Sequence, residues 1–470
     1  MLKQKQLWLT PFLMIMLAGS FYCYEYILRI SPSVMIPELM KSFSIQATHI
    51  GVLSSFYYWG YAMGSILVGP FVDKYGPRKV LFWAAIACAI GTCFFASSES
   101  LLMANMSRFS VGLGSAFAFI GVLKIGALWL PGQYFGRLAG LCSMLGTASG
   151  MMGQIWLSTL MEHMSWQVLS VYSASVGGII AILLFLFLKD KPDSVGYASP
   201  NSEMQSKETF AQLFNAFKKI GKRGVFWQNC IIGFTTFLPI IAFADLWGIP
   251  FMQENYGITR EVAALQVSMV FLGWSLGGPT LGYLYDKFKN WQAIFLIGTG
   301  VAFLSSALIL FYPMPLDMMR YVLLLFGFSA SSHVLVFVGS KKMSTPEIEG
   351  TTLGVTNLFM MSAGVFVQPC IGIIIDYFIP MMDKLGLTFT TIQSYQCALS
   401  LIPLSLVFTL YLIKLVSRVV DQQDEDAEKN TDPRLSLTAQ LSMLRYQSWP
   451  GNRYMSHVEE SPGSTGQSAR

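Results

Sequence analysis

Charged residues are scarce in this sequence, and residues suited to metal binding are scarcer still. Asp, Glu, Lys and Arg make up 12% of its 470 residues, against about a quarter in average soluble domains. The four histidines form no His-Glu-x-x-His pattern, which excludes a zinc protease of that class. No Gly-x-x-x-x-Gly-Lys-Ser/Thr loop is present, so we expect no ATP-driven activity. We therefore expect neither an enzyme nor a bound cofactor or metal.

Disulfide bonds and nucleic-acid contacts are also not expected. The chain has seven cysteines, an odd number, and all lie inside apolar segments without metal-like spacing, which predicts small buried side chains. The net charge of +5 is modest and its basic residues stand in short polar segments, so no nucleic-acid partner is expected.

Long hydrophobic segments are the abundant feature. Hydrophobic residues make up 53% of the chain, and apolar runs of about twenty residues, enough to cross a bilayer, fill residues 8–416. The first run follows Lys3 and Lys5 as a secretory signal would, but it lacks a small-residue cleavage site and should be retained. The sequence predicts an all-α membrane protein with helices at 7–29, 51–72, 80–96, 102–128, 137–160, 168–188, 225–251, 262–285, 291–312, 318–341, 351–377 and 392–416.

Two polar segments divide the chain. They predict a first bundle at 1–188, a cytoplasmic linker at 189–224, a second bundle at 225–416 and a disordered cytoplasmic tail at 417–470. Lys and Arg concentrate in alternate loops, and short cytoplasmic loops are the ones enriched in these residues. We therefore expect a monomer in a bacterial inner membrane with both termini in the cytoplasm.

A short charged stretch at residues 69–79 is repeated at 282–287. Both copies contain Gly-x-x-x-Asp-Lys, and their aspartates, Asp73 and Asp286, are 213 residues apart. Further positions recur in nearly the same register, which indicates an internal duplication. Gly136, Gly140, Gly150 and Gln154 reappear 214 residues later at Gly350, Gly354, Gly364 and Gln368, and Arg108 reappears at Arg320.

The first copy resembles the loop between helices two and three of the major facilitator superfamily. The resemblance implies twelve helices in two six-helix bundles, with a binding site between them near the membrane midplane. It also implies that the motif residues brace helix ends during a conformational change. These residues are Gly69, Asp73, Lys74, Gly76, Arg78 and Lys79, interrupted by Pro77, with Arg108 in helix four and Gly282, Asp286 and Lys287 in the second copy.

The first predicted helix carries four polar residues on one face. Tyr22, Glu25, Tyr26 and Arg29 follow helical spacing, and Glu25 and Arg29 are placed to pair. An ionisable group at membrane depth costs about 2.5–3.5 kcal/mol on insertion scales, so it needs a reason. Two interpretations remain open: a structural ion pair near the outer surface, or a substrate anchor at Arg29 beside a proton-carrying Glu25.

A narrower resemblance is to organic-anion/proton symporters, the group of the sialin, galactonate and hexuronate carriers. It rests on Arg29, Pro37 and the segment 51–61, which begins Gly-Val-Leu-Ser-Ser-Phe. The chain departs from that group in helix four, where Gly112-Leu-Gly-Ser-Ala contains no acid. The coupling carboxylate is then elsewhere or absent.

Lys124 and Arg108 are the cations of the fourth predicted helix. Arg108, with Gly112 and Gly114, matches the family's Arg-x-x-x-Gly-x-Gly motif and is interpreted as tying helices together. Lys124 either extends to the cytoplasmic surface or faces the cavity as a second anion-binding cation beside Arg29.

Five residues of the second half are further candidates. Asp245 in the seventh helix is either a second proton site, since a dry cavity disfavours the charged carboxylate, or a helix-end acid facing water. Its neighbour Trp247 is placed to contact a solute. His333 is assigned either gating or helix packing. Asn357 and Gln368 can hydrogen-bond a ligand or another helix.

These features predict a secondary transporter that moves a small organic anion, coupled to protons, through the lipid bilayer. An amino acid, peptide or siderophore transporter is the alternative within this class, since two acids beside two cations suit a zwitterion. A non-transporting sensor on the same fold is the alternative outside it.

Overall fold

The computed structural model describes residues 2–131, 134–190, 192, 221, 224–288, 290–344 and 349–430. Their regular secondary structure is entirely helical, which confirms the all-α prediction. Residues 1–416 form one compact unit, and 417–470 are a separate unit. Most of the expected linker at 189–224 and the tail from 431 onward lie outside the described residues.

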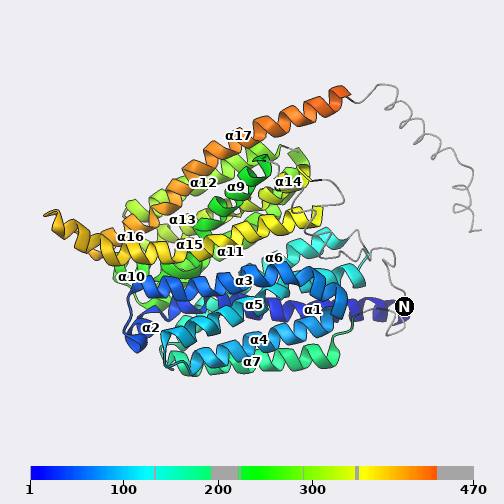
Figure 1. Ribbon diagram of the computed structural model, residues 1–470, viewed down its shortest axis with the longest axis horizontal. Coiled ribbons are helices and arrows are strands. Elements are labelled where there is room, and N and C mark those ends of the chain that lie inside the picture. Colours follow the sequence, from blue (N-terminus) through cyan, green and yellow to red (C-terminus); the bar gives the residue numbers. More distant parts are fainter. Residues whose placement is uncertain are drawn as a thin grey trace, which may run out of the picture. The chain divides into compact units, whose positions relative to one another are not determined.

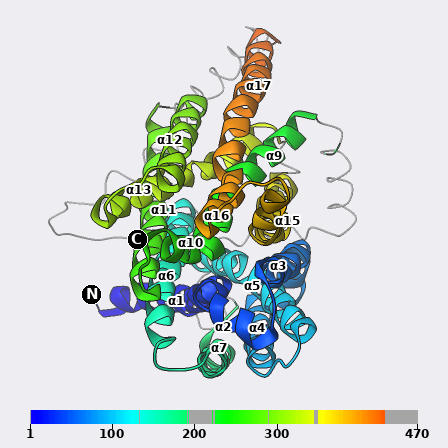
Figure 2. The same cartoon turned by 90° about the vertical axis from the view of Figure 1, so that its left-hand side faces the viewer.

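The first half of the unit contains seven α-helices and one 3-10 turn. It occupies the lower part of Figures 1 and 2. Its elements are α1 (Leu2–Ile30), η1 (Ser31–Val34), α2 (Ile36–Phe43), α3 (Ala47–Tyr75), α4 (Pro77–Ala96), α5 (Leu101–Trp129), α6 (Phe135–Leu160) and α7 (Trp166–Phe187).

The second half lies above the first in both views and contains interrupted helices. Its elements are α9 (Gly224–Pro239), the π-helix η4 (Ile240–Trp247), α10 (Gly248–Tyr256), α11 (Arg260–Phe288), α12 (Trp291–Phe311), α13 (Leu316–Ala330), the 3-10 turn η5 (Ser331–Val334), α14 (Leu335–Lys342), α15 (Glu349–Lys384), α16 (Thr391–Leu399) and α17 (Leu401–Asn430).

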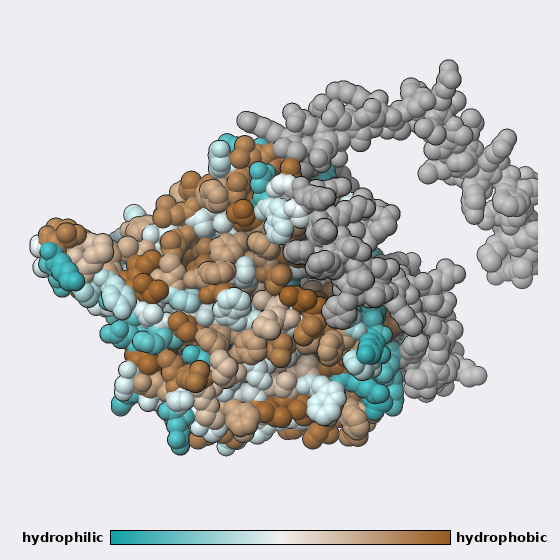
Figure 3. Space-filling model, viewed as in Figure 1, coloured by the Kyte–Doolittle hydropathy of each residue, from teal (hydrophilic) through white to brown (hydrophobic). Residues whose placement is uncertain are grey.

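Ten helical segments of the described chain are long and apolar enough to cross a membrane. They correspond to ten of the twelve expected helices. The other two expected ranges are occupied by α3 and α6, which have 29 and 26 residues but are richer in small and polar side chains. Hydrophobic side chains cover the sides of the helices in Figure 3, and hydrophilic ones gather toward their ends. The helices therefore present an apolar band suited to lipid.

The last helix is longer than the sequence predicted. We expected it to end at residue 416, whereas α17 continues to Asn430. The added segment is rich in Arg, Gln, Glu and Asp, and a helix already nucleated in the bilayer is extended at little cost by such residues. The prediction of disorder is therefore wrong for residues 417–430.

Helices α3 and α5 of the first half cross at two glycines. A Cβ atom at Gly60 would lie 2.0 Å from the Phe109 carbonyl oxygen, and one at Gly112 would lie 1.9 Å from that of Tyr57. No real Cβ fits at these distances, so the crossing requires glycine on both helices. The close approach brings Tyr57 and its neighbours against α1.

The second half repeats this crossing between α11 and α13. A Cβ at Gly273 would lie 2.0 Å from the Leu324 carbonyl oxygen, and one at Gly327 would lie 1.9 Å from that of Val270. These glycines follow Gly60 and Gly112 by 213 and 215 residues. The duplication inferred from the loop motif therefore extends to the packing of the helices.

The charged motif forms a tighter turn than expected. Helix α3 continues through Asp73 and ends at Tyr75, and α4 begins at Pro77, so Gly76 alone connects them. Gly76 has a φ of +83°, a conformation that favours glycine. The Asp190 carboxylate accepts a hydrogen bond of 2.7 Å from the Arg78 amide and so caps the start of α4.

Candidate functional site

A buried ion pair lies at the end of α1. Arg29 Nη2 donates to Glu25 Oε1 at 3.1 Å, and the Tyr57 hydroxyl of α3 donates to Glu25 Oε2 at 2.9 Å. Glu25 is 1% exposed and Arg29 5% exposed. An ion pair at a water-exposed surface does not fit this burial. Removing one member of such a pair leaves an uncompensated charge, at a cost of about 3–5 kcal/mol.

Tyrosine rings surround the guanidinium of Arg29. Its Cζ lies 4.3 Å from the Tyr26 ring centre and 5.8 Å from that of Tyr61. Tyr22 contacts the edge of Tyr26 at 6.1 Å, and Tyr26 contacts Phe271 of α11 at 6.2 Å. The polar face predicted for α1 therefore points toward the second half of the unit, where its rings continue across the interface.

Asp245 reaches the same region from the second half. The Tyr58 hydroxyl of α3 donates to Asp245 Oδ2 at 2.5 Å, so the bond joins the two halves. Asp245 is 3% exposed, which rules out the helix-end acid facing water. It lies close enough to interact electrostatically with Arg29 and Glu25. We call Glu25, Arg29, Tyr57, Tyr58 and Asp245 the buried cluster.

Asp245 is carried by a π-helix whose backbone is held by two glutamines. Gln154 Nε2 of α6 donates to the Ala244 carbonyl, and Gln368 Nε2 of α15 donates to the Ile241 carbonyl, both at 2.6 Å. A π-helix is widened and rarely stable alone, and such segments are common at functional sites. The two glutamines stabilise the distortion by satisfying carbonyls within it.

Gln154 was not among the predicted site residues, although its partner Gln368 was. The signal was present in the sequence, because the two positions are equivalent in the internal repeat. They act in different ways: Gln154 reaches across the interface, whereas Gln368 bonds within its own half.

Arg108 holds the end of α1 in place. Its guanidinium donates to the carbonyls of Leu28 and Arg29 at 2.8 and 3.1 Å, and lies 5.0 Å from the Tyr57 ring centre. The last carbonyls of a helix lack intrahelical partners, so a charged donor stabilises them. This contact positions the backbone that carries Glu25 and Arg29.

Lys124 lies far from the buried cluster. It is on α5, sixteen residues beyond Arg108, which places it roughly 24 Å further along the helix axis. Its Nζ donates to Asp73 Oδ1 at 2.7 Å, and a third of its side chain is exposed. The prediction that Lys124 and Arg29 converge on one small solute is therefore wrong, because the length of α5 separates them.

The two halves are fastened together at the end opposite Asp73. Arg260 at the start of α11 pairs with Glu38 of α2. Asp376 of α15 accepts hydrogen bonds from the backbone amides of Ala47 and Thr48, at 3.1 and 2.6 Å, and thereby caps α3. Sequence reasoning missed all three charged residues, because it searched for charge inside the helices rather than at their ends.

Close backbone packing accompanies these polar contacts. A Cβ at Gly51 would lie 2.3 Å from the Gln368 carbonyl oxygen, and one at Gly372 would lie 2.4 Å from that of Ala47. Gly364 lies against the Tyr58 ring. These contacts join α3 and α15 between the buried cluster and the end of the unit that lies away from Asp73.

The comparisons with known proteins agree with this architecture. The sequence profile of the Major Facilitator Superfamily matches residues 12–369. The chain belongs to this superfamily. A probable sulfoacetate transporter of Cupriavidus necator is 22% identical over 77% of this chain and 87% of its own. The cis,cis-muconate transport protein of Acinetobacter baylyi is 25% identical over 63% of this chain and 71% of its own.

A solved structure shares the fold. It is a bacterial homolog of the human lysosomal transporter Spinster in an inward-facing, unoccupied conformation. Its TM-score is 0.71 at 18% identity, over 88% of this chain and 98% of the other. The expectation of a multi-pass membrane transporter rather than an enzyme is thus confirmed by membership of the major facilitator superfamily.

The remaining candidates of this major facilitator protein are spread over the second half. Trp247 is fully buried and faces no open cavity. His333 lies in η5 with Nδ1 3.1 Å from the Ala330 carbonyl oxygen, and its ring contacts Trp274 at 5.2 Å. Asn357 is half-buried beside the Tyr61 hydroxyl. Of these, only Asn357 adjoins a ring of the Arg29 environment.

The two copies of the superfamily motif occupy equivalent places. Asp73 and Lys74 lie in the last turn of α3, and Asp286 and Lys287 in the last turn of α11. Lys74 Nζ lies 5.1 Å from the adjacent Tyr75 ring, and Lys287 Nζ lies 5.5 Å from the adjacent Phe288 ring. A Cβ at Gly69 or Gly282 would meet no described residue within 4 Å. Lys79, after the turn, is exposed.

Proposed function

We propose that the protein is a proton-coupled transporter of a small organic anion that works by alternating access. The observation that carries this proposal is the buried cluster, in which one guanidinium and two carboxyl groups meet between the halves. The relatives named above, which are described as carriers of sulfoacetate and cis,cis-muconate, support an anionic solute.

Arg29 is the anchor for the solute in this proposal. It is held by Glu25 at 3.1 Å, so an incoming carboxylate or sulfonate must compete with Glu25 for the guanidinium. A proton on Glu25 removes the competing charge and frees the fork of Arg29 for two parallel hydrogen bonds. Binding of the anion and binding of the proton would then favour each other.

Charge balance supports the same coupling. Glu25 and Asp245 together carry one more negative charge than Arg29 neutralises, and Arg108 is occupied by backbone carbonyls. Unbalanced charge is costly in a dry site, so one bound proton is favoured. The Tyr58–Asp245 bond would transmit the change between the halves.

Alternating access is supported by where the halves touch. Glu38, Arg260 and Asp376 hold them together at the end opposite Asp73. The basic residues favour a cytoplasmic Asp73 end, with both termini on that side. In that orientation the closed end is the outer one, and the conformation is inward-facing. The bundles 1–188 and 225–416 would move as the two bodies of the cycle.

Uptake by purified protein in liposomes tests the proposed function. We expect radiolabelled sulfoacetate or muconate, or another small organic anion of a screened panel, to accumulate when the outside is more acidic than the inside. Amino acids, dipeptides and siderophores belong in the same panel, and protein-free liposomes are the control. Stabilisation by a ligand without any transport would contradict the proposal and favour the sensor.

The Asp376 cap gives a prediction about closure. In Asp376→Ala, the amides of Ala47 and Thr48 lose their acceptor, a loss worth about 1 kcal/mol for a helix cap. We expect hydrogen exchange at the start of α3 to accelerate about fivefold, as measured by mass spectrometry. Asp383→Ala, an exposed acid further along α15, is the matched control. Equal exchange in both variants would show that the cap does not hold the closed end.

A further inference from the structure

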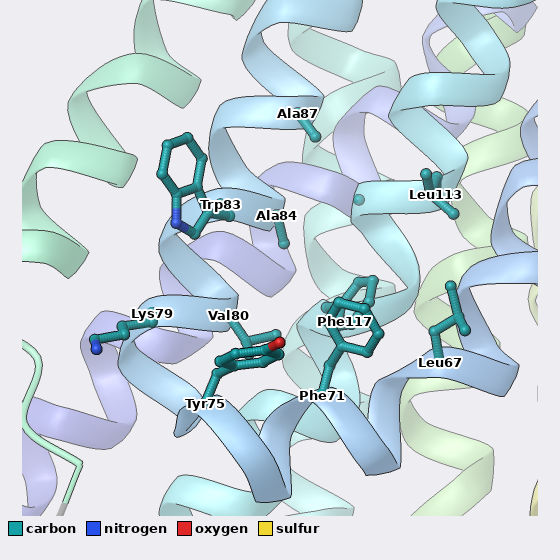
Figure 4. A pocket seen from close by; sticks show the side chains of 11 residues that line it. Leu67, Phe71, Tyr75, Lys79, Val80, Trp83, Ala84, Ala87, Leu113 and Phe117 are labelled. Carbon is teal, nitrogen blue, oxygen red and sulfur yellow. The ribbon is translucent and has the colours of Figure 1, made fainter. Parts of the chain in front are cut away.

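A hollow lies on the outer face of the first half, separate from the buried cluster. It has a volume of about 560 Å³ and lies between α3, α4 and α5 near the turn at Gly76. Figure 4 shows Tyr75 and Lys79 toward one end and Ala87 toward the other. Trp83 is 65% exposed and Tyr75 48% exposed, so the hollow opens toward the surrounding lipid.

The packing of small residues explains why the hollow exists. Helix α4 packs on α5 where Gly114 meets the Ala84 carbonyl oxygen, and α3 packs on α5 where Gly64 meets that of Leu113. Both helices are therefore drawn onto α5, and Ala84 and Ala87 are too small to fill the space between them. The aromatic side chains, such as Phe71 and Trp83, line it instead. An apolar space of this kind suits a hydrocarbon chain.

Positive charge gathers at the end of the hollow near the turn. Lys79 lines it, and Lys74 lies against the ring of Tyr75, which also lines it. The nearby acids are engaged: Asp73 pairs with Lys124, and Asp190 accepts from the Arg78 amide. The Arg78 guanidinium donates to the Phe185 carbonyl. Lys74 and Lys79 therefore leave an excess of positive charge at the mouth.

We propose that this hollow binds one anionic phospholipid. An acyl chain lies against Phe71, Trp83 and Phe117, and the phosphate lies between Lys74 and Lys79. Basic residues at a membrane surface attract anionic headgroups, and Tyr and Trp favour the same depth of the bilayer. The charge complementarity selects an anionic lipid over a zwitterionic one.

Native mass spectrometry of the detergent-purified protein tests this site. Phosphatidylglycerol and phosphatidylcholine with identical chains are titrated separately, and the bound fraction is measured. One basic residue contributes about fivefold to binding at an anionic surface. We therefore expect phosphatidylglycerol to bind at least about fivefold more tightly than phosphatidylcholine, and Lys79→Ala to lose about fivefold of that affinity.

Two further variants separate the headgroup from the chain. Ala87→Trp fills the hollow and is expected to abolish the tight phosphatidylglycerol adduct, whereas Lys79→Arg retains it. The matched controls are Lys287→Ala, at the equivalent of Lys74 in the second motif copy, and Val176→Trp on the exposed face of α7; both should bind as the original protein does.

The proposal is overturned if Lys79→Ala and Ala87→Trp both retain the adduct, or if the two lipids bind equally. Equal binding would leave a chain-binding groove without headgroup selection. Should Ala87→Trp fail to fold, as judged by gel filtration, the comparison of Lys79→Ala with Lys79→Arg still decides the outcome.

Discussion

Replacing Arg29 by lysine should weaken the binding of an anionic substrate by roughly tenfold or more, because a charge-assisted hydrogen bond is worth about 1.5–3 kcal/mol. Lysine retains the charge but loses the fixed fork that holds a carboxylate through two bonds. Arg29→Ala should reduce affinity further. The measurement is substrate affinity of purified protein by isothermal titration calorimetry.

The burial of Arg29 requires a stability control. Arg29→Ala leaves Glu25 charged and unpaired, so some loss could reflect unfolding rather than recognition. The double variant Arg29→Ala/Glu25→Gln removes both charges and should fold while still failing to bind the anion. Thermal unfolding of each variant reports the difference.

Lys124→Ala is the matched cation variant for this experiment. Sequence reasoning expected it to weaken anion binding too, but its separation of roughly 24 Å from the Arg108 level of α5 predicts affinity within about twofold of the original. Normal affinity in Arg29→Ala would reduce Arg29 to a structural partner of Glu25. It would also remove the main residue-level support for an anionic substrate.

Neutralising Glu25 should separate exchange from uphill transport. In Glu25→Gln, Arg29 is permanently free of a competing charge, as it would be beside a protonated glutamic acid. We expect liposomes containing this variant to exchange internal for external substrate but to lose accumulation driven by a proton gradient. Exchange requires no net proton movement, so it should persist at a rate near that of the original protein.

Asp245→Asn decides between the two carboxyl groups. An asparagine can still accept from the Tyr58 hydroxyl, so this variant keeps the bond between the halves but carries no proton. Loss of uphill uptake in Asp245→Asn alone would assign coupling to Asp245 instead. Uphill uptake that survives in both single variants would exclude both residues as coupling sites.

Most of the helical architecture could be predicted from the chain. Membrane helices announce themselves by length and apolar composition, because each must satisfy its backbone hydrogen bonds internally. The α1 face with Glu25 and Arg29 was equally accessible, since helical spacing alone places them together. The internal repeat was visible in short motifs, although its deepest consequence, the pair of glycine crossings, needed the coordinates.

The site across the interface could not be predicted in the same way. Tyr58 and Asp245 are 187 residues apart, and no local pattern connects them. The same holds for Asp376, whose partners at the start of α3 are more than 320 residues away. Lys124 was misplaced for a related reason: being on the right helix was taken as being at the right depth.

The sequence by itself determined that this is a duplicated helical membrane protein with a charged face on its first helix. Local spacing and hydropathy are sufficient for this, because bilayer thickness and helix periodicity act on short segments. Only the tertiary structure decided which charges meet. The glycine-mediated approach of α3 to α15 buries Glu25 and Arg29 beside Asp245, and it leaves Lys124 at the other end with Asp73. Long-range packing sets those distances, and it depends on the shapes of both surfaces at once.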